Sequence, residues 1–257
     1  MFFIGSTGTK GLNHCIYEIV DNSVDEHLAG FCDTIYVTLE ADGSCTVEDN
    51  GRGVPVGMHE KGVSAERVVL TTLHAGGKFD GASYKTSGGL HGVGSSAVNA
   101  LSSSFDITIK RDGVISHDHY ERGVPTVELV GGLLPVVGRT NRTGTRINFT
   151  PDPDIFDTVR FKADEIKSRL HETAYLNPEL TIIYKDLRGS EPDEATYHEP
   201  EGLIGFVKDM NRNNETISDI VYFKGTSEDI SIEVAFQYVN EFHEEVLGFC
   251  NCIYNSE

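Results

Sequence analysis

Apolar positions recur along residues 11–29 with the spacing of an amphipathic helix. The apolar or small side chains of this segment are Leu12, Cys15, Ile16, Ile19, Val20, Val24 and Leu28. Gly30 follows directly and supplies a stop signal. The pattern therefore predicts one helix with a single buried face.

Alternation of apolar and polar residues predicts the strands, and returns of the helical spacing predict further helices. Asp42-Gly43 and Asp112-Gly113 are hairpin turn signals, each between two alternating segments. Strands are predicted at residues 34–40, 45–48, 105–110, 114–120, 126–130, 145–150, 181–185, 230–238 and 246–253, and helices at 64–73, 95–101, 159–175 and 203–210. Helices beside such strands indicate an α+β fold, a two-layer sandwich of helices on a mixed, mostly antiparallel sheet.

One polar stretch, residues 186–201, interrupts these patterns. It carries Gly189, Pro192 and Pro200 and has few apolar positions. Domain boundaries fall in segments of this composition. We therefore predict one domain over residues 1–200 and the beginning of a second α+β domain, cut short, over residues 201–257.

Charge and cysteine content narrow the class of protein. The formal net charge is −19, so this chain by itself should bind DNA poorly. The five cysteines are an odd number, and Cys250 and Cys252 stand too close together for a zinc knuckle, which favours reduced thiols. No signal peptide or membrane span is evident, and we expect a cytoplasmic protein without a membrane partner.

The first predicted helix carries a polar triplet. His14, Glu18 and Asn22 are spaced i, i+4 and i+8, so they lie in line on one helix face. A carboxylate can take a proton from water, an imidazole can hold that carboxylate, and an amide oxygen suits Mg²⁺. The alternative is an ordinary solvated polar face.

Two glycine-containing segments add candidate ligand contacts. The first, Asp49 to Gly53, follows a predicted strand, so an acidic group at the strand end could read a ring amine, although such a turn is also common by itself. The second, Gly76 to Gly94, holds seven glycines, with Lys78 and Lys85 among them, and leads into a helix N-terminus that attracts phosphate oxygens. A plain flexible linker is the alternative. The segment matches neither a Walker A motif nor a Rossmann fingerprint.

The order of these signals resembles a known family. Glu18 to Asn22, Asp49 to Gly53 and Gly88 to Gly94 are similar to the nucleotide-binding motifs shared by gyrase, the heat-shock chaperone, histidine kinases and MutL. Val20 to Glu26, His74 to Phe79 and Ser87 to Gly94 resemble, more narrowly, the bacterial gyrase B and topoisomerase IV B group of type IIA topoisomerases. This resemblance runs along essentially the whole chain.

The resemblance implies roles for particular residues. Glu18 would be the general base with His14 as its partner, Asn22 the Mg²⁺ ligand, and Asp49 the reader of the adenine amine, supported by Thr145 through water. Arg52 would pair with Glu26 beneath the adenine, and Arg111 and Pro55 would line an outer pocket that binds aminocoumarins. The remaining nucleotide contacts would be Gly53, Lys78, Lys85, Gly88, Gly89, Leu90, His91, Gly92, Val93, Gly94 and Ser95.

The same resemblance implies a function and partners. ATP with Mg²⁺ would order the glycine segment, close a homodimer around DNA and power strand passage, with the DNA-cleaving tyrosine on a gyrase A-type subunit of an A2B2 assembly. DNA would be bound through the full-length protein. A binding-only dimerisation module of the mismatch-repair or chaperone type is the alternative, and a histidine kinase domain is a further one.

Overall fold

Period-two burial along the strands gives the main sheet one apolar face. Val37, Val47, Ile147 and Ile107 are paired side by side across four strands, and each is at most 6% exposed. Residues next to them in sequence point to the opposite face, because successive side chains of a strand alternate. The apolar face is where the helices pack.

The computed structural model describes residues 4–72, 94–228, 230–242 and 244–254. Its large sheet has the strand order β5-β4-β3-β7-β2-β1-β8-β9, with β6 also paired to β4. The β1–β8 pair is parallel and the other pairs are antiparallel. The strands are β1 (Thr34–Leu39), β2 (Cys45–Asp49), β3 (Ser102–Arg111), β4 (Val114–Glu121), β5 (Val124–Pro125), β6 (Val136–Arg139), β7 (Gly144–Pro151), β8 (Thr181–Asp186) and β9 (Asp193–Tyr197).

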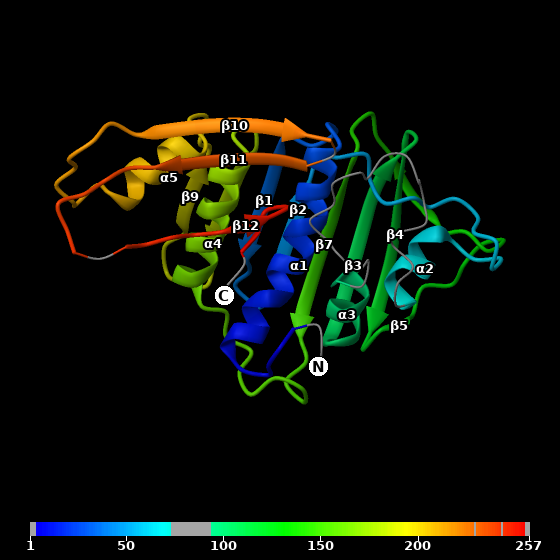
Figure 1. Cartoon of the computed structure of the whole chain (residues 1–257). Coiled ribbons are helices and arrows are strands. Elements are labelled where there is room, and N and C mark those ends of the chain that lie inside the picture. Colours follow the sequence, from blue (N-terminus) through cyan, green and yellow to red (C-terminus); the bar gives the residue numbers. More distant parts are fainter. Residues whose placement is uncertain (1–3, 73–93, 229, 243, 255–257) are drawn as a thin grey trace.

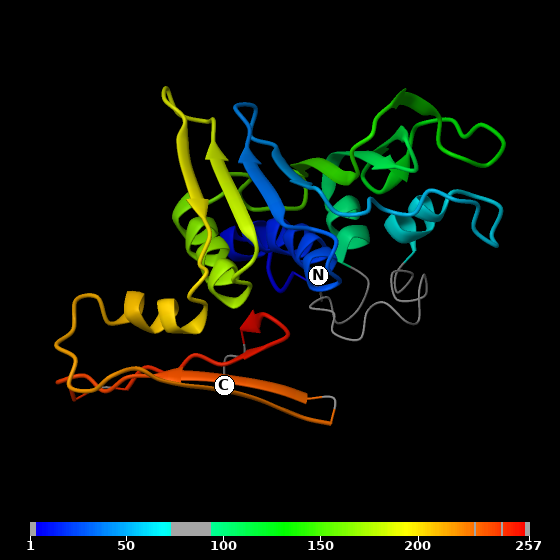
Figure 2. The same ribbon diagram turned by 90° about the horizontal axis from the view of Figure 1, so that it is seen from above.

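Helices cover one face of this sheet, and one further helix and two small hairpins lie beyond them (Figures 1 and 2). The α+β class with a mixed, mostly antiparallel sheet is thereby confirmed. The helices are α1 (Thr9–Leu28), α2 (Ala65–Thr71), α3 (Gly94–Ala100), α4 (Ala163–Leu176) and α5 (Leu203–Met210), and the hairpins are β10 (Val221–Ser227) with β11 (Ile230–Phe236) and β12 (Phe249–Cys250) with β13 (Ile253–Tyr254). None of the helices in these described ranges has the length and apolar character needed to cross a bilayer.

The predicted first helix is confirmed as α1, which buries Leu12, Ile16 and Ile19 almost completely against the sheet. Both turn signals are confirmed as well. Asp112 and Gly113 have φ of 53° and 80° between β3 and β4, and Gly43 has φ of 90° between β1 and β2. Asp and Gly tolerate this left-handed conformation better than other residues.

Two predicted strands are wrong. Residues 126–130 form no continuous strand, because the carbonyl of Val127 accepts a hydrogen bond from Arg67 instead of joining a ladder. Residues 246–253 are not one strand either. Asn251 and Cys252 have φ of 48° and 65° and turn the chain back on itself, so that the short β12–β13 hairpin forms.

Some elements were not predicted. The polar run of residues 186–201 contains β9, an edge strand whose only inward side chains are half-buried, so its sequence carries little alternation. β6 and β10 were also missed, and both are largely exposed. The boundary near residue 200 stays a prediction, although β9 ends at Tyr197 and α5 begins at Leu203.

A buried network of acidic groups joins α2 to β4. Glu66 and Asp118 are both 0% exposed, and Asp118 accepts two hydrogen bonds from Arg67. Tyr120 donates to Oε1 of Glu66, at 2.7 Å, while Oε2 of Glu66 has no partner. Burial raises the pKa of Glu66, and the neighbouring Asp118 carboxylate raises it further. The raised pKa favours the protonated, neutral form of Glu66 in the folded chain.

Glu66→Gln should therefore stabilise the chain at high pH. The folded-state pKa of Glu66 lies above its unfolded value, so the native state loses stability as pH rises through this interval. Glutamine resembles the protonated acid and should remove that loss. We expect a gain of about 1–3 kcal/mol at pH 9 that shrinks towards pH 5, measured by urea unfolding.

The matched control is Glu121→Gln, because Glu121 is an exposed acid on β4, the strand that carries Asp118 and Tyr120. It should leave the pH dependence of the unfolding free energy unchanged. An equal gain at both pH values for Glu66→Gln would contradict a raised pKa of Glu66 in the folded chain.

Candidate functional site

The predicted polar triplet of α1 contains a hydrogen-bonded imidazole and carboxylate. Nε2 of His14 lies 2.9 Å from Oε1 of Glu18, one helical turn away. The second oxygen of Glu18 faces the start of α3, where a Cβ added to Gly94 would lie only 2.1 Å from it. Any larger residue at position 94 would displace this carboxylate. Because residue 94 is a glycine, the backbone at the start of α3 can approach the Glu18 carboxylate closely.

Asn22 lies next along the same face of α1. Its amide nitrogen donates to the Glu18 carbonyl at 2.6 Å and to Oγ of Ser95 at 3.1 Å. Both N–H donors of the amide are thus used, and its oxygen remains as an acceptor in an exposed position. Within the described ranges there is no group of three or more His, Cys, Asp or Glu side chains that could hold a metal ion.

Asp49 ends β2 on the helix-facing side of the sheet and is only 8% exposed. One carboxylate oxygen accepts from the backbone N–H groups of Gly51, at 2.8 Å, and Thr145, at 3.3 Å. The other accepts from the hydroxyl of Ser23, at 3.0 Å. Burial raises the pKa of Asp49, and these three donors oppose the rise. Oδ2 retains one acceptor position for a further donor.

Close backbone packing surrounds Asp49. Gly144 has φ of 141°, and a Cβ there would lie 2.1 Å from the Asp49 carbonyl oxygen. The hydroxyl of the next residue, Thr145, accepts from the N–H of Val54 at 3.2 Å. The turn after β2 and the start of β7 are therefore held together. This contact needs a residue without a side chain at position 144 and a hydrogen-bond acceptor at position 145.

An ion pair lies beside this turn. Arg52 donates to both carboxylate oxygens of Glu26, from Nη2 at 2.8 Å and from Nε at 3.0 Å. The guanidinium also lies 4.0 Å from the centre of the Phe31 ring. A bidentate pair stacked on a ring holds the guanidinium plane in one orientation. A flat surface results next to Asp49.

Arg111 contacts the backbone of the same turn, and Pro55 follows two residues after Gly53. Nη1 of Arg111 donates to the Gly53 carbonyl at 2.6 Å, and Pro55 is half-buried. Gly53 has φ of 80°, and a Cβ there would lie 2.8 Å from the Lys110 carbonyl, so this position also requires glycine. The structure thus brings the Asp49 turn and Arg111 together.

Other predicted contacts fall outside the described residues. They are Lys78, Lys85, Gly88, Gly89, Leu90, His91, Gly92 and Val93. The described ends of that segment are close to each other, because α2 packs against α3 and Asn99 of α3 donates to the Leu70 carbonyl at 3.0 Å. Gly94 and Ser95 are thereby placed beside Glu18 and Asn22.

Two participants were missed by the sequence analysis. Ser23 lies inside a motif already singled out, but its hydrogen bond to Asp49 depends on how α1 packs on β2. Gly144 stands between two threonines, and this sequence indicates only that a strand begins here. Its positive φ and its contact with Asp49 are tertiary features that a local pattern does not report.

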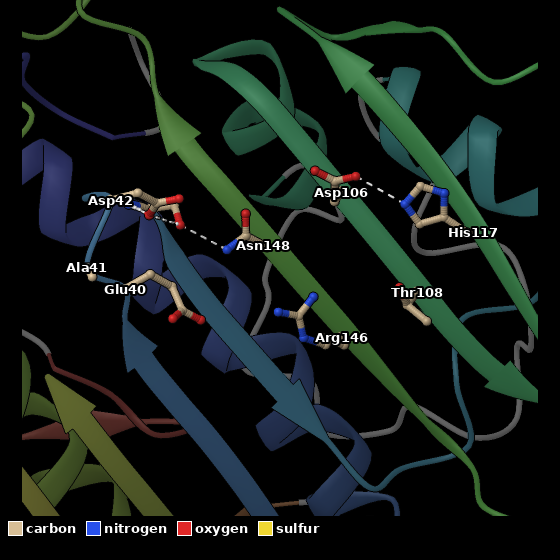
Figure 3. Close-up of a pocket in the computed structure, with 9 residues that line it drawn as sticks. Glu40, Ala41, Asp42, Asp106, Thr108, His117, Arg146 and Asn148 are labelled. Carbon is tan, nitrogen blue, oxygen red and sulfur yellow. Dashed lines mark hydrogen bonds and ion pairs between the residues drawn. The ribbon is translucent and has the colours of Figure 1, made fainter. Parts of the chain in front are cut away.

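The polar outer face of the sheet holds a separate cavity of about 520 Å³ (Figure 3). Glu40, Asp106, His117 and Arg146 line it, with Asp106 accepting from His117. These side chains point away from α1, since Thr145 and Ile147, which flank Arg146, face the helices. None of the predicted site residues lines this cavity. A smaller cavity, of about 440 Å³, does reach Asp49 from the same outer side.

Comparison with known proteins gives matches along most of the chain. A family model described as histidine kinase-, DNA gyrase B- and HSP90-like ATPase matches residues 7–155, and a model for DNA gyrase B matches residues 202–257. The DNA gyrase B protein of Archaeoglobus fulgidus is 48% identical over 99% of this chain and 40% of its own length. The DNA topoisomerase 4 B protein of Staphylococcus epidermidis is 46% identical over 97% of this chain and 37% of its own.

A solved structure gives the same picture. The 43K ATPase domain of Thermus thermophilus gyrase B, in complex with an aminocoumarin, superposes with a TM-score of 0.83. It is 36% identical and covers 98% of this chain and 64% of that one. This chain therefore spans about two fifths of the length of the curated relatives it matches.

Gly144→Ala tests the packing around Asp49. The added Cβ would meet rigid backbone at 2.1 Å in a conformation with φ of 141°. We expect the free energy of unfolding to fall by at least about 2 kcal/mol, measured by urea unfolding. The control is Gly138→Ala. Its Cβ would lie 3.3 Å from Cδ1 of Ile115 and 3.7 Å from Cβ and Cγ1 of the same side chain, so it should change stability by less than about 1 kcal/mol. Equal effects of the two changes would show that the Gly144 contact is not tight.

Proposed function

This chain belongs to the histidine kinase-, DNA gyrase B- and HSP90-like ATPases, and we propose that it is the ATP-binding and ATP-hydrolysing part of a type II DNA topoisomerase of the gyrase B kind. The observation that carries this proposal is that two groups of polar residues lie on the same side of the sheet, the side on which the helices pack. A buried acceptor, Asp49, lies at one end, and the His14–Glu18 pair with Asn22 lies along α1.

Asp49 is suited to adenine by its hydrogen bonding. An ionised carboxylate only accepts, and three of its acceptor positions are already filled by the protein. The remaining position on Oδ2 matches the exocyclic amine of adenine, which donates. A guanine would present a carbonyl there and be repelled. The Glu26–Arg52 pair would supply the flat surface beneath the ring, and Thr145 would support the contact through water.

Glu18 is placed to act as the general base for hydrolysis. It would accept a proton from water as the water oxygen bonds to the γ-phosphorus and the bond to the bridging oxygen of the β-phosphate breaks. His14, bonded to the other side of the carboxylate, would hold it in position. Exposure of the pair to the side where α3 begins gives the water access.

The residues also fit a Mg²⁺ ion with the nucleotide. The amide nitrogen of Asn22 is fixed by Glu18 and Ser95, which turns its oxygen outward as a hard ligand. When bound, Mg²⁺ would neutralise phosphate charge. The phosphates would lie along the glycine segment, with Gly94 and Ser95 from its described end and Lys78, Lys85 and residues 88–93 from the rest.

The names of the relatives support a proposal about the partners and the place of action. Gyrase B and topoisomerase IV B proteins are subunits, so we propose an ATP-dependent homodimer that works with an A-type DNA-cleaving subunit in the cytoplasm. DNA would be bound by the full-length protein, because this chain has a net charge of −19. Arg111 and Pro55, at the rim of the Asp49 turn, would contact an aminocoumarin of the kind bound to the Thermus thermophilus domain.

The mismatch-repair or chaperone alternative is not favoured. Relatives named gyrase B or topoisomerase IV B align over 97–99% of this chain, including the part after residue 202. The family model that matches this later part, residues 202–257, is the one for DNA gyrase B.

Conservative substitutions separate the adenine reader from the base. Asp49→Asn should weaken binding of a non-hydrolysable ATP analogue with Mg²⁺ by about 10–100-fold, because one charge-assisted acceptor is lost. It should also reduce the preference over the matching GTP analogue. Glu18→Gln should keep the affinity within about threefold and lower any ATP turnover by at least about a hundredfold. Calorimetry and a phosphate-release assay measure the two effects.

Asp106→Asn is the control, because Asp106 lines the cavity on the outer face of the sheet. It should leave analogue affinity unchanged. A loss of binding in Asp106→Asn with none in Asp49→Asn would place the nucleotide on the wrong face for this proposal.

A further inference from the structure

The larger cavity, on the outer face of the sheet, contains an arginine without an ionic partner. Arg146 of β7 is half-buried and lies directly opposite Glu48 of β2 in the strand register. Glu48 nevertheless pairs with Lys110 of β3, at 2.6 Å. Among the described residues the Arg146 guanidinium makes a single hydrogen bond, a long one of 3.4 Å to Oγ1 of Thr46. Most of its N–H donors are therefore available to a ligand.

A second donor lies beside this arginine. Thr108 of β3 is the direct neighbour of Arg146 across the β3–β7 pair, and its hydroxyl makes no hydrogen bond within the part of the chain that the structure describes. Figure 3 shows both side chains at the same cavity. An arginine fork binds the two oxygens of a carboxylate, and a neighbouring hydroxyl can donate to one of them. This side of the cavity is therefore suited to a carboxylate.

The other side of the cavity is acidic. Oε1 of Glu40 accepts from the Thr46 hydroxyl at 2.6 Å, so Glu40 and Arg146 lie on two sides of one hydroxyl group. They form no ion pair with each other, and Oε2 of Glu40 has no bond to another described residue. Asp42, in the turn that follows, is ionised at neutral pH because hydrogen bonds from Ser44 lower its pKa. This side of the cavity is therefore suited to a cation.

The polar groups at the far end of the cavity are already bonded to each other. Oδ1 of Asp106 accepts from His117 at 3.0 Å and from His119 at 3.1 Å. The groups with spare hydrogen-bonding positions are thus a guanidinium with a hydroxyl on one side and the Glu40 carboxylate on the other. A ligand that complements them carries an acceptor and a donor of opposite charge.

We propose that the outer cavity binds a small zwitterion of the α-amino acid type, with its carboxylate on Arg146 and Thr108 and its ammonium group on Glu40. Such a ligand carries its two charges on groups separated by one carbon atom. It has no net charge, so the net charge of −19 does not repel it. A simple anion would be repelled by the three acids that line the cavity. The volume of about 520 Å³ lies within the range of small-molecule pockets.

This site is separate from the proposed nucleotide site. None of the described residues assigned to the nucleotide lines the outer cavity. Alternation along β7 also places Arg146 on the opposite face from Thr145. The zwitterion should therefore bind in the absence of nucleotide, and a failure of the proposed function would leave this proposal unchanged.

The test is an NMR titration of the chain with L-alanine, without nucleotide, and with the two half-ligands propionate and ethylamine. The amide resonance of Thr108 should shift saturably with L-alanine, and each half-ligand should bind at least about tenfold more weakly because it uses one charged contact. Arg146→Gln and Glu40→Gln should each weaken L-alanine binding at least about tenfold. The matched controls Arg142→Gln and Glu191→Gln change exposed residues outside the cavity and should leave binding unchanged.

Three outcomes would overturn the proposal. No saturable shift with L-alanine would exclude the site, and propionate binding as tightly as L-alanine would exclude the contact with Glu40. Equal weakening by Arg146→Gln and Arg142→Gln would mean that overall charge alone matters. Arg146→Lys keeps the charge without the fork and should retain part of the affinity. Each variant should unfold at the urea midpoint of the parent chain, so that a loss of binding is separated from a loss of folding.

Discussion

The buried carboxylate of Asp49 is the constraint on which the site depends. Its three hydrogen-bond donors come from α1, from the turn after β2 and from β7. A carboxylate this deeply buried is stable only when such donors surround it. The helix and two strands must therefore keep their relative positions for the fold to tolerate this group. The geometry that would read an adenine is the same geometry that makes the acid tolerable.

Much of this arrangement could be predicted from the sequence, because the relevant segments carry strong local signals. The helical spacing of α1, the alternation of β2 and β7 and the Asp-Gly turns all determine structure within a few residues. The failures have tertiary causes. Residues 126–130 alternate like a strand, but Arg67 takes the Val127 carbonyl, and the Ser23–Asp49 hydrogen bond joins residues 26 apart. The roles assigned to the site residues remain predictions.

Alternation along the strands also separates two very different polar regions. Thr145 and Asp49 face α1, while their neighbours Arg146 and Glu48 face outward, where the larger cavity lies. If cavity volume were the only criterion, the cavity on the outer face would be chosen as the functional site. The inner region instead combines a buried acceptor, a carboxylate held by an imidazole and backbone approaches that only glycine permits. Chemistry therefore distinguishes the two regions where volume does not.

The position of α1 in the middle layer explains why one helix can serve several neighbours. Its apolar stripe, with Ile16 and Ile19, is fixed against the sheet, while Glu18 and Asn22 face α3. A packed helix of 20 residues moves as a body rather than bending residue by residue. A displacement imposed on α1 at its contact with the sheet is therefore felt at its contact with α3, where Glu18 and Asn22 lie.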